Sequence, residues 1–217
     1  NRLSPVFITS ASSMGRAKQE RLVRFMERGG HALIAPVLPE LDENYAPCTI
    51  LRDRLGATDT LNSGSVASRV TIAGVVNINN NGSLFVSGRI PRQAKVVGID
   101  EISGKPLAWE VGVGRGKALF LGFNWSHGSR EQGQMLRNLL SRLGLVPRVE
   151  CDNQNLWVVL RTSGTRSMLF AMNLLTSNAR ARIRCRPGWS KGMIDAGEHD
   201  VPAMSVKCIP LTTGCRK

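Results

Sequence analysis

The sequence predicts an α/β domain with a parallel sheet, followed by a small antiparallel β-sandwich. Residues 6–35 read as strand, helix and strand, which is the length and order of a right-handed βαβ unit. After Pro147 no helical periodicity remains, and short apolar stretches alternate with polar turns. We therefore predict two domains, residues 1–147 and residues 148–217. Because the chain begins just ahead of a buried strand, we expect the first domain to lack its first elements.

Three segments make up the βαβ unit. Residues 6–10 and 31–35 are short, apolar runs, as expected for parallel strands that are buried on both faces. Between them, residues 16–28 place apolar side chains at helical spacing, so a helix is predicted there. Ser12 or Ser13 is the expected N-cap of this helix, because a hydroxyl can accept from a free amide of the first turn.

The rest of the first domain predicts more strands and a final helix. The expected segments are a helical turn over residues 49–55, β-like alternation within residues 66–97, a polar loop or hairpin connection at residues 77–82, strands at residues 109–113 and 118–123, and a helix over residues 130–143. Ser126 or Ser129 would cap that last helix. This capping role accounts for the hydroxyls beside His127 without any catalytic chemistry.

The second domain reads as four strands separated by polar turns. The expected strands are residues 156–160, 167–174, 181–185 and 204–209. Asp195, Glu198 and Asp200 are interpreted as a small solvated acidic loop. Buried free thiols in strands are the expected state of the cysteines, although a bridge between Cys185 and Cys208 stays open.

The composition is strongly basic, with 29 Lys and Arg against 16 Asp and Glu, and a net charge of +13. Such an excess is typical of proteins that bind nucleic acid or another polyanion. Arg180, Arg182, Arg184 and Arg186 alternate along one predicted strand, which would place all four guanidinium groups on one face as a candidate anion site. The same pattern also fits a solvated face or a protected sheet edge. Nucleic acid is therefore the alternative partner and not the expected one.

Motifs for catalysis, metals and cofactors do not emerge from the sequence. The five Cys and three His are scattered without the spacing of a zinc site. The glycines at residues 112, 114 and 116 lead into a strand, whereas a phosphate-binding loop must open a helix. We predict no catalytic residue, no metal site and no cofactor in this chain. We also expect no membrane association, since no apolar run reaches the length of a membrane span.

Several segments resemble glycosidase domains. The stretches QERLVRFMERGGHALIAPVLP (residues 19–39), PCTILRDRLG (47–56) and GRGKALFLGF (114–123) resemble the glutamine-amidotransferase-like, flavodoxin-like domain that follows the catalytic barrel in family 35 and family 42 β-galactosidases. The stretches LFAMN (169–173) and VPAMSV (201–206) resemble strands of the small C-terminal β-sandwich of these enzymes.

The resemblance implies a supporting role. In such enzymes a TIM barrel hydrolyses terminal β-galactosides with two Glu residues, and this chain is too short to contain that barrel. It implies a non-catalytic portion whose partner is the barrel of the same full-length protein and, in family 42, a second protomer of a homo-oligomer. Two alternatives remain: polyanion binding through Arg180–Arg186, and carbohydrate binding by an exposed Trp125, Trp157 or Trp189. We expect these three indoles to be core residues.

Overall fold

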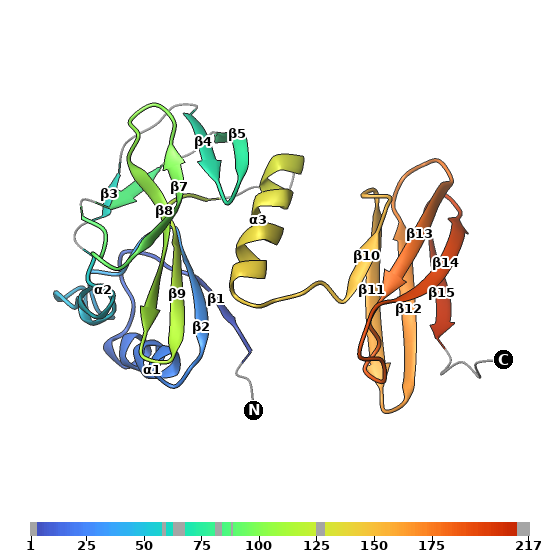
Figure 1. Cartoon of the computed structure of the whole chain (residues 1–217), viewed down its shortest axis with the longest axis horizontal. Coiled ribbons are helices and arrows are strands. Elements are labelled where there is room, and N and C mark those ends of the chain that lie inside the picture. The colour runs from blue at the N-terminus through green and yellow to red at the C-terminus, as the bar shows by residue number, and fades with distance from the viewer. Residues whose placement is uncertain are drawn as a thin grey trace. The chain divides into compact units, whose positions relative to one another are not determined.

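The computed structural model describes residues 4–57, 60–62, 68–80, 84–87, 89–124 and 129–211. Two compact units divide the chain, Asn1–Leu145 and Val146–Lys217, and each unit is described by itself (Figure 1). In the part of the chain that the structure describes, no helix is long and apolar enough to span a membrane.

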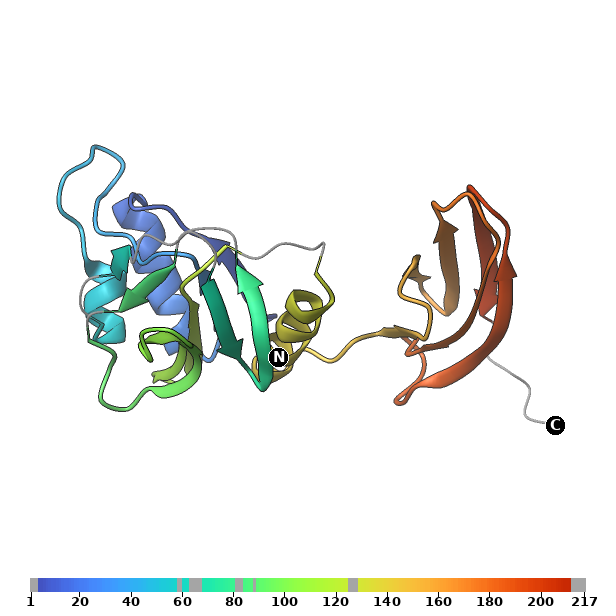
Figure 2. The same ribbon diagram turned by 90° about the horizontal axis from the view of Figure 1, so that it is seen from above.

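The first unit is built on a seven-stranded sheet with three helices. The strands of this sheet are β1 (Val6–Thr9), β2 (His31–Ala35), β4 (Ser68–Ile72), β5 (Val75–Asn80), β7 (Lys95–Asp100), β8 (Pro106–Val113) and β9 (Gly116–Leu121), in the order β1-β2-β9-β8-β7-β4-β5. The helices are α1 (Arg16–Glu27), α2 (Ile50–Leu55) and α3 (Arg130–Arg142), and β3 (Thr60–Asn62) pairs with β6 (Phe85–Ser87). Figures 1 and 2 show α1 and α3 on opposite sides of the sheet.

Burial on both faces explains the apolar run of β2. Its side chains alternate between two core clusters: Leu33 packs in the cluster that contains α3, and Ile34 packs in the cluster that contains α1. A strand covered on both faces needs apolar residues where it is buried, and residues 32–35 meet that need, while the half-buried His31 begins the strand. The predicted strands at residues 6–10 and 31–35 and the helix between them are confirmed, with ends within one residue of the expected bounds. The expected burial on both faces is wrong for β1, because β1 is an edge strand of the sheet and Phe7 and Thr9 are exposed.

The predicted flavodoxin-like parallel sheet is not observed, because the sheet is mixed. Only β1, β2 and β9 pair in parallel, and the remaining strands pair antiparallel. Two-residue turns account for the pairs β4–β5 and β8–β9, since so short a connection can join only antiparallel neighbours. One such turn is Ala73-Gly74, where both residues have positive φ (52° and 81°).

Two local predictions in this unit are wrong. The expected polar loop at residues 77–82 is in its described part the end of β5, where buried Ile78 alternates with the outward Asn77 and Asn79. Residues 81 and 82 lie outside the described residues. Neither Ser12 nor Ser13 caps α1: the helix is preceded by Gly15, and the amide of Arg16 donates to Oε2 of Glu43 at 2.9 Å.

The cap of α3 is the expected one. The hydroxyl of Ser129 accepts a hydrogen bond from the amide of Gln132 at 3.4 Å, one turn into the helix. Ser126 and His127 lie outside the described residues.

The second unit contains two antiparallel three-stranded sheets. One sheet has the order β10 (Val149–Cys151), β13 (Ala179–Cys185), β14 (Ile194–Val201), and the other has the order β11 (Leu156–Ser163), β12 (Arg166–Asn173), β15 (Ser205–Leu211). Their inward residues form one core that includes Leu169, Ala171, Ala181 and Ile183. The antiparallel β-sandwich expected from the turn-separated strands is therefore present.

The predicted acidic loop is wrong, because Ile194–Val201 is strand β14, paired along β13. A register shift at Ile183/Arg184 and the positive φ of Gly197 (96°) interrupt the alternation of this strand. An irregular strand of this kind loses the two-residue period by which strands are found in a sequence. The short strand β10 was not predicted either.

Candidate functional site

The outer face of the sheet β10-β13-β14 holds three of the four arginines that the sequence singled out. Residues of β13 alternate between buried and exposed, and Arg180, Arg182 and Arg184 occupy the exposed positions. Carboxylates project from the two flanking strands: Glu150 of β10, and Asp195, Glu198 and Asp200 of β14. We call these seven residues the ionic face.

Each arginine of the ionic face is paired. Nη2 of Arg180 lies 2.6 Å from Oε2 of Glu198, and its Nε lies 3.9 Å from Oδ1 of Asp200. Arg182 donates to Asp195 through Nη2 and, at 3.0 Å, through Nε. Arg184 lies 3.3 Å from Glu150. Three guanidinium groups thus meet four carboxylates, so the ionic face carries no local excess of positive charge.

The pairs shift the titration of their members. The hydrogen bond that Arg180 donates to Glu198, together with the charge of that carboxylate, raises the pKa of Arg180. The hydrogen bonds that Asp195 accepts from Arg182 and from the amide of Gly197 lower the pKa of Asp195. All of these groups are exposed, where water screens ion pairs and leaves them little net stabilisation.

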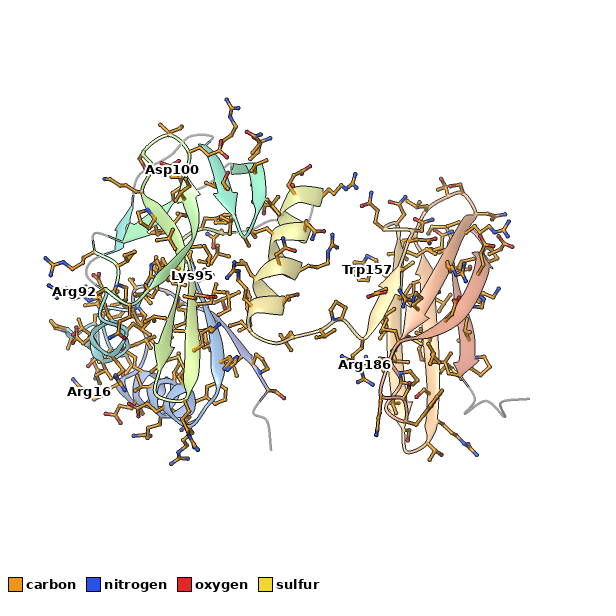
Figure 3. The ribbon with its side chains drawn as sticks, viewed as in Figure 1. Arg16, Arg92, Lys95, Asp100, Trp157 and Arg186 are labelled. Atoms are coloured by element: carbon orange, nitrogen blue, oxygen red, sulfur yellow. The ribbon has the colours of Figure 1, made fainter. Side chains whose placement is uncertain are left out.

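Arg186 is separated from the other three arginines. It follows the end of β13, and its amide donates to the carbonyl of Arg148 at 2.8 Å (Figure 3). Because β13 is the central strand of its sheet, its arginines do not protect a sheet edge. The geometry matches the solvated, ion-paired interpretation, and anion binding by these residues stays a prediction.

Ionisable groups of the first unit are engaged in structural contacts. Glu110 lies 3.7 Å from Nζ of Lys117 and 3.4 Å from Nη1 of Arg142. The buried carboxylate of Asp100 closes a turn by accepting from the amide and hydroxyl of Ser103. His31 shares a 3.0 Å hydrogen bond with the carbonyl of Leu143. Among the described residues, no group of three His, Cys, Asp or Glu could hold a metal ion.

The described cysteines are free thiols, namely Cys48, Cys151, Cys185 and Cys208. A bridge between Cys185 and Cys208 is therefore absent: Cys185 faces the core, and Cys208 is exposed on the opposite side of its own sheet. Burial raises the pKa of Cys151 and of Cys185, which disfavours the reactive thiolate at both positions. The prediction that the thiols are buried holds for Cys48 and Cys185 and is wrong for Cys208.

A cavity of about 680 Å³ lies beside β1 and the start of α1. Its apolar wall comes from Val6, Ile8, Leu22 and Phe25, and Lys18, Arg21 and Glu43 add charged groups to the lining. Helix starts attract anions, but here the carboxylate of Glu43 already accepts from the first amide of α1. The cavity thus contains an internal anion at the position where a ligand anion would bind.

The tryptophans differ from the prediction that all are core residues. The side chain of Trp157 is 64% exposed on β11 (Figure 3), so that expectation is wrong for this residue. Trp189 packs against the core of the second unit, and its indole nitrogen is buried without a hydrogen-bond partner among the described residues. Trp125 lies outside the described residues.

Comparisons with known proteins place these units among glycosidase-related domains. A family model described as "GLMA-like, second domain" matches residues 2–94. An exo-β-D-glucosaminidase of Pyrococcus horikoshii is 29% identical over 168 residues, which are 72% of this chain and 20% of that protein.

Solved structures of β-galactosidases share the fold over nearly the whole chain. One from a Rahnella species has a TM-score of 0.75 at 14% identity and covers 95% of this chain and 32% of its own. A GH42 β-galactosidase from G. stearothermophilus has a TM-score of 0.71 at 18% identity, over 95% of this chain and 31% of its own. This chain therefore spans about a fifth to a third of the length of these relatives. The predicted resemblance to a glycosidase-related domain is confirmed at that level.

Proposed function

We propose that the chain is a non-catalytic structural portion of a glycoside hydrolase whose catalytic TIM barrel lies in the rest of a longer polypeptide. The observation that supports this most is the fold match with β-galactosidases, which takes in 95% of this chain but only about a third of theirs. Two thirds of such an enzyme therefore remain for the ~250 residues that a barrel requires.

The contacts of the ionisable groups support the same proposal. General acid–base hydrolysis of a glycoside needs two carboxyl groups that face a shared substrate position. In this chain Glu110 is held by Lys117 and Arg142, and Asp100 closes a turn. The carboxylates of β14 pair with the arginines of β13. These carboxyl groups form ion pairs and hydrogen bonds within their own units, and none of these contacts brings two of them to a shared substrate position.

The substrate of the parent enzyme would be a terminal β-linked sugar. The structural neighbours and the motif resemblance favour a β-galactoside. A β-D-glucosaminide is a second candidate, because the sequence match over 168 residues is to an exo-β-D-glucosaminidase.

Chromogenic p-nitrophenyl β-D-galactoside and β-D-glucosaminide test the proposal with two proteins. One is this 217-residue chain and the other is the polypeptide encoded by the complete gene. We expect release of nitrophenol by the complete polypeptide and a rate equal to the blank for the 217-residue chain. Turnover by the 217-residue chain that Glu110→Gln abolishes would overturn the proposal.

A further inference from the structure

The outer face of the sheet β11-β12-β15 is apolar. Its residues pair across the strands in three rows. The rows are Trp157, Met172 and Val206; Val159, Phe170 and Cys208; and Met168 with Pro210. We call these eight residues the apolar face. They alternate along each strand with inward residues of the core, so the apolar face is the second side of the sheet and not part of the interior.

Much of the apolar face is open to solvent. The exposed fraction is 64% for Trp157, 54% for Val206 and 36% for Met168. The outward positions of the three strands hold no Asp, Glu or Lys, and the only outward charges are Arg161 and Arg166 at one end. An antiparallel sheet with one free side normally turns polar residues outward, and a contiguous apolar patch marks an interaction surface.

The sequence of β12 agrees with coverage on both sides. Met168–Met172 is an unbroken apolar run in which Leu169 and Ala171 face the core, while the other three residues face outward. Such a run is typical of strands that are covered on both faces. The apolar face is also rich in Trp, Phe and Met with Arg at its margin and lacks Lys and carboxylates. That composition is the one enriched in the centres of protein–protein interfaces.

We infer that the apolar face docks on the rest of the parent glycosidase polypeptide, against an apolar surface whose margin places carboxylates opposite Arg161 and Arg166. This inference rests on the proposed function. The relatives carry at least twice as much additional polypeptide as this chain supplies, and that polypeptide is available to cover the face.

Other occupants fit less well. A sugar site needs hydrogen-bonding side chains beside its aromatic ring, whereas Trp157 is paired with Met172, and Met172 in turn with Val206. A second copy of the chain would bring together two bodies of net charge +13, and their repulsion opposes association.

Side-chain reactivity in two proteins tests the inference. Alkylation of Cys208 by iodoacetamide and oxidation of Met168 by hydrogen peroxide are followed by mass spectrometry in the complete polypeptide and in the 217-residue chain. We expect both reactions to be about tenfold or more slower in the complete polypeptide, because a covered side chain reacts only when the interface opens. Met204 is the matched control: it is 68% exposed on the turn between β14 and β15, and it should oxidise equally in both proteins.

A pair of variants separates docking from folding. In the complete polypeptide, Trp157→Glu should restore fast alkylation of Cys208, because a carboxylate in the centre of a dry interface opposes docking. Glu198→Ala, a change at an exposed position of the ionic face, should leave the protection intact. When the same two substitutions are made in the 217-residue chain, the free energy of unfolding in urea should equal that of the unsubstituted 217-residue chain.

Three results would overturn the inference. One is equal reactivity of Cys208 in the two proteins; if the complete polypeptide still hydrolyses its glycoside, the proposed function stands and only the docking fails. Another is protection of Cys208 in the 217-residue chain that increases with protein concentration, which would identify a second copy as the occupant. The last is a complete polypeptide without glycosidase activity, which removes the proposed function and the partner together.

Discussion

The two sheets of the second unit present opposite chemistry on their outer faces. The ionic face consists of arginines and carboxylates that pair with one another in water, whereas the apolar face turns Trp157, Phe170 and Val206 outward. Both sheets place small or branched apolar residues inward, into one shared core. The two sheets therefore differ in the polarity of their outward side chains, whereas their inward side chains are alike.

This difference is the basis for the inference that a partner docks on the apolar face. The ionic face is neutralised by its own residues and needs no other molecule to satisfy its charges. In the part of the second unit that the structure describes, the apolar face has no residues of its own that cover it, and removing its apolar side chains from water is favourable. Substitutions in the core, between the two sheets and on the ionic face test this difference.

The largest expected effect comes from the shared core. Leu169→Ala removes a side chain that is 0% exposed and should lower the free energy of unfolding by about 2–5 kcal/mol, through lost burial and a cavity. Met168→Ala, at the next position of β12 and on the apolar face, is the matched control and should cost far less in the 217-residue chain. Urea unfolding followed by circular dichroism measures both variants. Equal losses would show that the apolar face is already covered.

A somewhat smaller effect is expected at Asn173, which joins the two sheets. Its Nδ2 donates to the carbonyls of Ser177, Val201 and Pro202 at 2.8–3.1 Å, and its Oδ1 accepts from the amide of Leu175. Asn173→Ala removes all four bonds of a buried side chain, including the buried bond to Val201, so we expect a loss of about 1–3 kcal/mol in the same unfolding measurement. Asn178→Ala, an exposed amide that makes one bond to Ala203, is the control and should be close to neutral.

A small, pH-dependent effect is expected from Asp195. Its pKa is lowered in the folded chain, so its stabilising contribution is present above the pKa of the unfolded chain and is lost as pH falls through the lower folded value. Asp195→Asn should therefore be slightly less stable than the parent chain near neutral pH and indistinguishable from it at strongly acidic pH. Thermal unfolding from pH 2 to pH 7 checks this. A difference that persists at the acidic end would contradict the assignment.

The smallest effect is expected for polyanion binding. Because the arginines of the ionic face are paired, removing two ion pairs together with Arg180→Ala, Arg182→Ala, Asp195→Asn and Glu198→Gln leaves the net charge unchanged. This quadruple variant should hardly change the salt concentration that elutes the chain from heparin. The double change Asp195→Asn and Glu198→Gln alone should increase retention, since it removes the partner of Arg182 and leaves Arg180 only its 3.9 Å contact with Asp200. A large loss of retention in the quadruple variant, with a steep salt dependence, would support the polyanion-binding alternative.

Prediction from the sequence succeeded where one period covers a whole element. His31–Ala35 and the helix Arg16–Glu27 were found because every position fits a buried strand or an amphipathic helix. It failed at β14, where Gly197 interrupts the alternation and the carboxylates were interpreted as a loop. Three of the four candidate arginines were placed correctly on one face of β13, whereas Arg186 lies beyond the end of the strand. The partners of the three come from neighbouring strands that local patterns do not reveal.

The βαβ unit and the outward alternation of the arginines of β13 could be predicted from the sequence, because both depend on local periodicity. The mixed sheet of the first unit, the pairing of those arginines with carboxylates and the exposure of Trp157 could not. Strand order, ion pairing and burial depend on contacts between segments far apart in the chain. Such contacts arise from packing, which no single stretch of sequence contains.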